Sequence, residues 1–149
     1  MSACIATPLQ GPVSMSLPFA AESAGDVRVA LESWLGHHGY DDGVVDDARL
    51  IATELVGNAI THASPLRNGT VLVRWRLDSG GRLELTVADG GGLSAPRVLR
   101  AAPEALGGRG LAIVEALSST WWVERTSYLH AVHVRLDLQE PGARETAMR

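Results

Sequence analysis

Lysine is absent from this chain, because all 13 of its basic residues are arginines. A nucleotide site of the P-loop type uses a lysine to reach the terminal phosphates, and Schiff-base chemistry uses a lysine amine. Both kinds of site are therefore excluded. Cysteine is nearly absent too: Cys4 is the only one, which excludes intrachain disulfides and zinc sites with several cysteine ligands. Such cysteine usage favours a reducing, intracellular compartment.

Long apolar runs and an excess of positive charge are also missing. No stretch approaches the ~20 consecutive apolar residues of a membrane-spanning helix. Residues 1–18 lack the basic start and the continuous apolar segment of a signal peptide. The 17 acidic residues outnumber the arginines, and the formal net charge of −4 argues against a dedicated nucleic-acid-binding face. We therefore expect a cytoplasmic protein that binds neither a membrane nor nucleic acid directly.

The remaining composition is that of an ordinary globular protein. The chain has 149 residues, of which 46% are hydrophobic and 20% are charged. This is enough for one domain with one core, and it is not the composition of a disordered chain. We expect a flexible N-terminal tail over residues 1–13, a domain over 14–139 and a C-terminal tail over 140–149.

Two helices are predicted in the first half of the chain. Apolar residues recur with helical spacing over residues 21–38, and Gly39 is a typical helix end. The second helix is expected to begin after Asp41 or Asp42 as a capping residue and to end at about residue 62 or 63, before a Ser-Pro pair. The buried stripe of this second helix is expected to consist of Val44, Ala48, Ile51, Ala52, Leu55 and Ala59.

Strands are predicted where the hydrophobic period changes to two. Residues 14–20 alternate in part and contain a proline, as an edge strand does. Residues 70–77 and 82–88 alternate and are joined by a glycine-rich turn, which indicates a hairpin. Residues 121–125 and 129–138 are expected to form a closing hairpin.

A long connection separates the two hairpins. It begins at the glycines 90–92, shows a weak helical pattern near residues 98–105 and reaches a further helix over 111–117. Connections of this length in compact domains are usually lids or binding loops. From this order of elements we expect an α+β fold, a two-layer sandwich whose mixed, mostly antiparallel sheet is covered by helices on one face.

Three groups of polar residues and glycines do not fit the elements that contain them. On the second helix, Glu54, Asn58 and His62 are spaced by one turn at the border of the buried face. Asp89 ends a buried strand before three glycines, where a carboxylate can accept a hydrogen bond from an amino group. Gly-Gly-Arg-Gly precedes the helix over 111–117, and a helix N-terminus beside an arginine is suited to an anion. Taken singly, each group is more typical of a solvated helix border, a flexible turn or a plain loop.

Taken together and in this order, the three groups resemble the nucleotide-binding boxes of the GHKL ATPase superfamily. These boxes are Glu-x-x-x-Asn on a helix, Asp-x-Gly after the following hairpin and Gly-x-Gly-Leu before a last helix. The segment ELVGNAITHA is similar to the branch of anti-sigma-factor serine/threonine kinases, histidine-kinase-like ATPases that switch bacterial sigma factors. The resemblance covers residues 15–138 and implies the Bergerat-type ATP-binding fold, with ATP and Mg²⁺ as cofactors.

The resemblance also implies a role for each box. Glu54 would be the general base that takes the proton of the attacking hydroxyl, and Asn58 would bind Mg²⁺ through its amide oxygen. Asp89 would accept a hydrogen bond from the exocyclic amine of adenine, and Gly91 would allow the backbone to approach the ligand closely. The other nucleotide-binding candidates are His62, Gly108, Arg109, Gly110 and Leu111, with residues 108–110 forming a lid over the phosphates.

Two positions depart from the pattern of this family. Leu93 stands where many relatives have a second glycine. Alignment of the last strand puts Ala131 where many relatives carry a threonine that helps to hold a water bound to adenine. On the same strand, His130 and His133 are three residues apart and should face opposite sides of the sheet, so we do not expect them to form a metal pair.

Two hypotheses for the function follow. In the first, the chain is a Mg-ATP-dependent serine/threonine kinase that phosphorylates a small antagonist protein and sequesters a sigma factor. In the second, it is a catalytically weak or inactive binding module of the same fold, which regulates a protein partner and uses nucleotide only as a ligand. Relatives of this type act as dimers, so a homodimer is a further expectation; the four tryptophans could lie in its interface or in the core.

Overall fold

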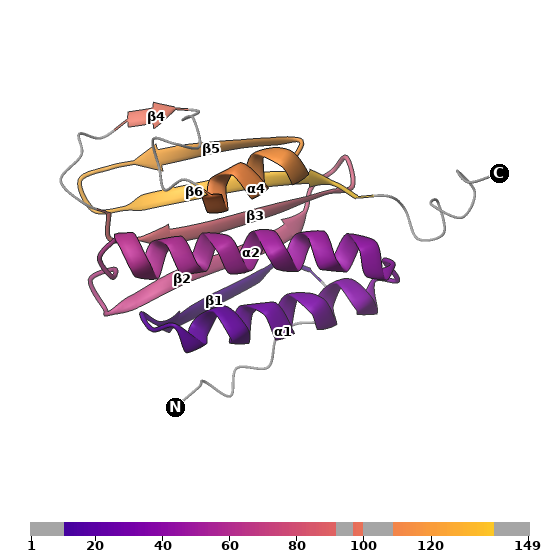
Figure 1. Ribbon diagram of the computed structural model, residues 1–149, viewed down its shortest axis with the longest axis horizontal. Helices are drawn as coiled ribbons and strands as arrows, with labels where there is room; N and C mark the ends of the chain where they lie inside the picture. The colour runs from indigo at the N-terminus through magenta and orange to yellow at the C-terminus, as the bar shows by residue number, and fades with distance from the viewer. Residues whose placement is uncertain (1–10, 92–96, 100–108, 139–149) are drawn as a thin grey trace.

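The protein is an antiparallel sheet with helices on one face. The computed structural model describes residues 11–91, 97–99 and 109–138. The elements follow one another as β1 (Val13–Pro18), α1 (Glu22–His37), α2 (Asp42–His62), β2 (Thr70–Leu77), β3 (Arg82–Asp89), β4 (Arg97–Leu99), α4 (Arg109–Leu117), β5 (Thr120–Arg125) and β6 (His130–Asp137). The sheet order is β1-β2-β3-β6-β5-β4, and every neighbouring pair is antiparallel. Helices α1, α2 and α4 lie on the same face (Figure 1), which confirms the expected α+β sandwich.

The two long helices form where the sequence pattern predicts them. At the start of α2, the side chain of Asp41 accepts a hydrogen bond of 3.0 Å from the N–H of Val44, so Asp41 is the N-cap and Asp42 is the first helical residue. After α1, Gly39 has a φ of +85°, a left-handed conformation that glycine adopts without strain. All six residues of the predicted stripe of α2 are buried. Within residues 11–91 and 109–138, no helix is long and apolar enough to cross a bilayer.

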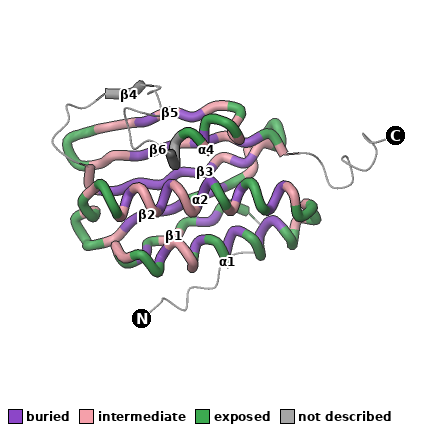
Figure 2. The backbone as a smooth tube through the Cα atoms, in the orientation of Figure 1, coloured by how far each residue is buried: buried purple, intermediate pink, exposed green. Residues whose placement is uncertain are grey.

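The core lies between the helices and the sheet, along the buried stretches of these elements (Figure 2). It contains three of the four tryptophans. Trp34 of α1 and Trp75 of β2 are each 1% exposed and meet edge to face, with ring centroids 6.5 Å apart. Trp121 of β5 is fully buried, and its indole N–H donates to Glu115 at 2.8 Å. Because aromatic side chains of this size remove much apolar surface from water, these three stabilise the fold and are not available for an interface between copies.

Between the two hairpins, the structure corrects part of the sequence prediction. Residues 98–105 were expected to be weakly helical, but Arg97–Leu99 forms strand β4, which pairs with β5 so that Leu99 lies opposite Val123. Backbone pairing with an existing sheet edge outweighs a weak local helical preference. The rest of that stretch lies outside the described residues. Helix α4 begins at Arg109, two residues earlier than expected, and β3 extends by one residue to include Asp89.

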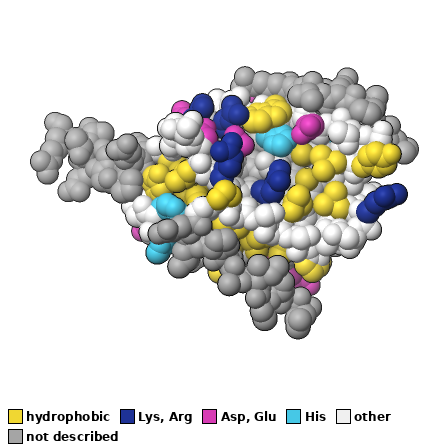
Figure 3. Space-filling view, turned by 180° about the vertical axis from the view of Figure 1, so that it is seen from behind, with side chains coloured by type: hydrophobic (Ala, Val, Ile, Leu, Met, Phe, Trp, Pro, Cys, Tyr) yellow, Lys and Arg dark blue, Asp and Glu magenta, His cyan; other side chains and the backbone are white. Residues whose placement is uncertain are grey.

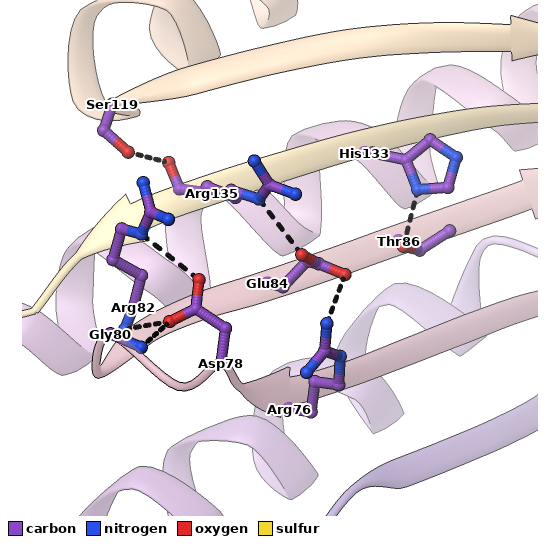
Figure 4. A network of polar contacts seen from close by, with 9 residues as sticks. All are labelled: Arg76, Asp78, Gly80, Arg82, Glu84, Thr86, Ser119, His133 and Arg135. Atoms are coloured by element: carbon purple, nitrogen blue, oxygen red, sulfur yellow. Dashed lines mark hydrogen bonds and ion pairs between the residues drawn. The ribbon is translucent and has the colours of Figure 1, made fainter.

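The face of the sheet opposite the helices carries a network of polar contacts (Figures 3 and 4). Glu84 accepts a hydrogen bond of 3.0 Å from the guanidinium group of Arg135 on the neighbouring strand. His133 contacts the hydroxyl of Thr86 at 2.9 Å, and its ring stacks on Trp122 with centroids 4.9 Å apart. The side chain of His133 therefore makes these contacts on the face of the sheet that points away from the helices.

The turn between β2 and β3 depends on one carboxylate. Asp78 accepts hydrogen bonds from the N–H groups of Arg82 at 3.0 Å and Gly80 at 2.8 Å, and from the Arg82 side chain at 3.2 Å. The backbone N–H of Arg82, followed by that of Gly80 and the charge of the Arg82 side chain, holds the pKa of Asp78 below its ordinary 3.8. A carboxyl whose pKa is lower in the folded state stabilises the fold above its unfolded pKa, and this stabilisation is lost as the pH falls through the folded pKa.

We therefore expect Asp78→Ala to lower the melting temperature at neutral pH, by an amount that shrinks as the pH falls below about 4. Thermal unfolding of both proteins between pH 7 and pH 2 measures this difference. Ser79→Ala, in the same turn, is the control and should give a difference that does not change with pH. A deficit for Asp78→Ala that stays constant down to pH 2 would contradict the role of the charge.

Candidate functional site

The first group of predicted site residues lies on the C-terminal half of α2. Leu55 and Ala59 of this half are buried against the core, whereas Glu54 and Asn58 are partly exposed at its border and His62 is exposed. The side-chain nitrogen Nδ2 of Asn58 is buried and has no hydrogen-bond partner. The carboxylate of Glu54 makes no hydrogen bond or ion pair with the part of the chain that the structure describes. A free carboxylate and an unsatisfied amide one turn apart are suited to a ligand rather than to the fold.

The end of α2 is joined to the end of β3 by backbone contacts. The N–H of Gly90 donates to the carbonyl oxygen of Ser64 at 2.7 Å, and Ser64 also forms an isolated antiparallel bridge with Gly91. A Cβ atom at Gly90 would lie 2.0 Å from the carbonyl oxygen of Pro65, so only glycine fits here. The C-terminal end of α2 and the end of β3, whose last residue is Asp89, therefore lie at the same end of the sandwich (Figure 1).

Asp89 is the last residue of β3 and lies on the helix side of the sheet, because it alternates with the core residues Leu85 and Val87. It is only 2% exposed. One of its oxygens, Oδ1, accepts a hydrogen bond of 2.7 Å from the N–H of Gly91, and Oδ2 lies 3.1 Å from Nδ1 of His130. A buried carboxylate requires such donors, and each oxygen keeps a further lone pair for a ligand.

The sheet register places Ala131 away from Asp89. In the pairing of β3 with β6, Asp89 lies opposite His130, and Ala131 lies opposite Ala88. Since successive residues of a strand face opposite sides, Ala131 is on the other face of the sheet from Asp89. The residue that shares the side of Asp89 is His130. The predicted separation of His130 and His133 onto opposite faces is confirmed.

A second residue that the sequence prediction missed is Arg125, the last residue of β5. It lies opposite His130 in the sheet, and it alternates with the buried Trp121 and Val123, so its side chain starts on the helix side as well. Its Nε atom is buried without a hydrogen-bond partner. Asp89, His130 and Arg125 thus form a row across three strands. The alternation of Arg125 with Trp121 and Val123 in the sequence could have predicted that its side chain starts on the helix side of the sheet.

The glycine-rich box is placed only in part. The backbone of Arg109, Gly110 and Leu111 forms the first turn of α4, which packs against α2. The N–H groups of a first helical turn have no partner within the helix and belong to the positive end of its dipole. Gly108 and Leu93 lie outside the described residues. In residues 11–91, 97–99 and 109–138, no three His, Cys, Asp or Glu side chains are grouped so that they could hold a metal ion.

Comparison with known proteins identifies the family. The model of the histidine kinase-like ATPase domain matches residues 17–136, a range that includes Glu54, Asn58 and Asp89. The chain belongs to this family. The resemblance inferred from the three boxes is thereby confirmed, and membership in an ATPase family implies ATP as the nucleotide.

Solved structures share the fold of this histidine kinase-like ATPase domain. The RsbU and RsbW domains of Rv1364c from Mycobacterium tuberculosis match with a TM-score of 0.68 and 23% identity, over 87% of this chain and 33% of that chain. A chain of the SiaB–SiaC complex from Pseudomonas aeruginosa matches with a TM-score of 0.61 and 11% identity, over 83% of this chain and 88% of that one. The chain thus spans about a third of the length of the first of these structures. No curated protein sequence matches it.

Proposed function

We propose that the protein is a Mg-ATP-dependent serine/threonine kinase that phosphorylates a small antagonist protein and sequesters a sigma factor. The observation that carries this proposal is the free pair Glu54 and Asn58 on α2. This helix is held by Ser64 and Gly90 against the strand that ends in Asp89. Phosphate transfer from ATP to a hydroxyl group needs a base for the proton, a ligand for the metal ion and a hydrogen-bond acceptor for the adenine amine.

The described residues fit ATP and Mg²⁺ in chemical type. Asp89 offers unused lone pairs to the exocyclic amine of adenine, and Gly91, with a φ of +75°, keeps the backbone close to it. The side-chain oxygen of Asn58 makes no hydrogen bond with the described part of the chain, so it can be presented to Mg²⁺, which neutralises charge on the phosphates when bound. The first turn of α4 supplies N–H groups for an anion. His62 is exposed and would lie at the rim of this site.

The proposed reaction follows from these groups. The carboxylate of Glu54 takes the proton of a serine or threonine hydroxyl of the partner protein. The hydroxyl oxygen forms a bond to the γ-phosphorus, the bond from that phosphorus to the β–γ bridging oxygen breaks, and ADP leaves with the electron pair. The products are the phosphorylated partner and ADP, so atoms and charge balance.

The proposed partners are proteins. The two similar structures contain RsbU and RsbW domains in one case and a SiaB–SiaC complex in the other, and a partner protein of that kind is the proposed substrate here.

Self-association belongs to the same proposal and is tested by sedimentation of the purified chain at micromolar concentration, where a monomer would contradict it. A protein that binds its partner and ATP without transferring phosphate would instead be the binding module of the second hypothesis.

Nucleotide recognition is tested at Asp89. We expect Asp89→Asn to weaken ATP binding by about 10- to 150-fold, equivalent to roughly 1.5–3 kcal/mol for a hydrogen bond to a charged group. Asparagine has one acceptor oxygen, and the N–H of Gly91 already engages such an oxygen in the wild type. The amide nitrogen would then face the adenine amine, donor against donor. Isothermal titration calorimetry with Mg-ATP measures the change.

The control for this variant is Asp137→Asn, which removes the same charge at an exposed position of β6. It should bind ATP as the wild type does. Absence of heat and of thermal stabilisation by millimolar Mg-ATP for the wild type would refute the proposed nucleotide site. Equal affinity of Asp89→Asn and wild type would refute the role of Asp89.

A further inference from the structure

Within the described part of the chain, the carboxylate of Asp89 has two donors, and only one of them is backbone. The N–H of Gly91 engages Oδ1, and the ring of His130 engages Oδ2 from the neighbouring strand. The side chain of Asp89 is 2% exposed and that of His130 is 19% exposed. The proposed function assigns Asp89 to adenine but leaves His130 without a role.

We propose that His130 is a positioning residue for adenine recognition, which holds the Asp89 carboxylate in the orientation that receives the exocyclic amine. This inference rests on the proposed function, because it concerns the same nucleotide site. A carboxylate held at one oxygen can still rotate about its Cβ–Cγ bond. A second donor at the other oxygen removes that rotation, so the unused lone pairs point in fixed directions before the nucleotide arrives.

The position of the His130 ring is itself restricted. His130 lies directly opposite Asp89 in the register of β3 and β6. On the other side, a Cβ atom at Gly91 would lie 3.3 Å from Cβ of His130, so the backbone after β3 passes close to the histidine. Glycine at this position, with its left-handed backbone, leaves room for the ring. The pairing of two central strands therefore sets the distance between the imidazole and the carboxylate.

The contact also determines which nitrogen of the ring carries a proton. An ionised carboxylate only accepts hydrogen bonds, so Nδ1 of His130 must be the donor. In the neutral ring, Nε2 is then unprotonated. Asparagine places its side-chain N–H₂ close to where histidine places Nδ1, so His130→Asn can keep the donor to Asp89, whereas His130→Ala removes it.

The test compares ATP with inosine triphosphate, which has a carbonyl oxygen where adenine has the exocyclic amine. In the wild type we expect ATP to bind more tightly than inosine triphosphate. His130→Ala should weaken ATP binding about tenfold and leave inosine triphosphate binding nearly unchanged, so the preference for ATP shrinks. His130→Asn should restore most of the preference. His133→Ala, on the same strand but on the outer face, is the matched control and should keep it fully.

A merely structural role would give a different result. If His130 only stabilised the strand pair, His130→Ala would lower the melting temperature and weaken both nucleotides alike; that result overturns the inference. Equal loss of the ATP preference in His130→Ala and His130→Asn also overturns it. If the wild type bound neither nucleotide, the proposed function itself would fail. The two failures are distinguishable, because this one is seen with the wild type alone and the failure of the inference is seen only in the variants.

A spectroscopic measurement on the wild type keeps the test independent of how the variants fold. Nitrogen NMR of the protein labelled at histidine should show His130 as the Nδ1-protonated tautomer in its neutral form. The opposite tautomer, with a bare Nδ1, would mean that the ring does not donate to Asp89 and would overturn the inference.

Discussion

Replacing Glu54 with glutamine is expected to lower the rate of phosphate transfer to the partner protein by about 10²–10⁴-fold, the usual cost of losing a general base. Glutamine keeps the length and a polar end, but it cannot take the proton of the attacking hydroxyl. Since Glu54 makes no hydrogen bond or ion pair within the described part of the chain, the melting temperature and ATP affinity should change little. Transfer of label from ATP to the purified partner, at saturating nucleotide, measures the rate.

Two further variants of α2 define what this result means. Asp47→Asn, an exposed position of the same helix, removes a carboxylate away from the site and should label the partner at the wild-type rate. Asn58→Ala should weaken Mg-ATP binding as well as transfer, because it removes the amide proposed to hold the metal. If Glu54→Gln labels the partner as fast as the wild type, Glu54 is not the base. If the wild type binds its partner and labels nothing, the binding-module hypothesis is favoured.

Replacing Gly90 with alanine is expected to destabilise the protein by about 1–3 kcal/mol, as overpacking of a tight site does, and to reduce ATP binding below detection. The added Cβ would meet the carbonyl oxygen of Pro65 at 2.0 Å and its carbonyl carbon at 2.8 Å. These are backbone atoms and cannot move as a flexible side chain can. Relief of the clash must separate the end of β3 from the segment after α2 and break the hydrogen bond from Gly90 to Ser64. Thermal unfolding and calorimetry with Mg-ATP measure both effects.

The matched substitution is Gly25→Ala in α1, where a Cβ would meet nothing within 4 Å. In a helix interior this exchange should stabilise the protein by roughly 0.5–1 kcal/mol and leave ATP binding intact. A Gly90→Ala protein that melts and binds ATP like the wild type would show that the two segments need not be held together for the site to form.

Local patterns were sufficient to predict most of the helices and strands. The spacing of apolar residues and the cap at Asp41 placed α2, and the alternation on both sides of the turn at Asp78 placed the hairpin of β2 and β3. These signals are local because hydrogen bonds of helices and turns join residues close in the chain. The order of the three boxes predicted the family for the same reason, since each box is a short contiguous segment. The weak helical pattern near residue 98 was misleading because β4 is decided by its pairing partner.

By itself, the sequence determined the helices, the hairpins and the identity of Glu54, Asn58 and Asp89 as candidates. Only the tertiary structure decided which residues meet them. The register of β3 with β6 puts His130, and not Ala131, beside Asp89, and a shift of one residue would reverse that assignment. The need for glycine at position 90 likewise arises from Pro65, a residue on another segment. Cross-strand neighbours and close backbone approaches depend on how distant segments pack, and no local periodicity encodes that distance.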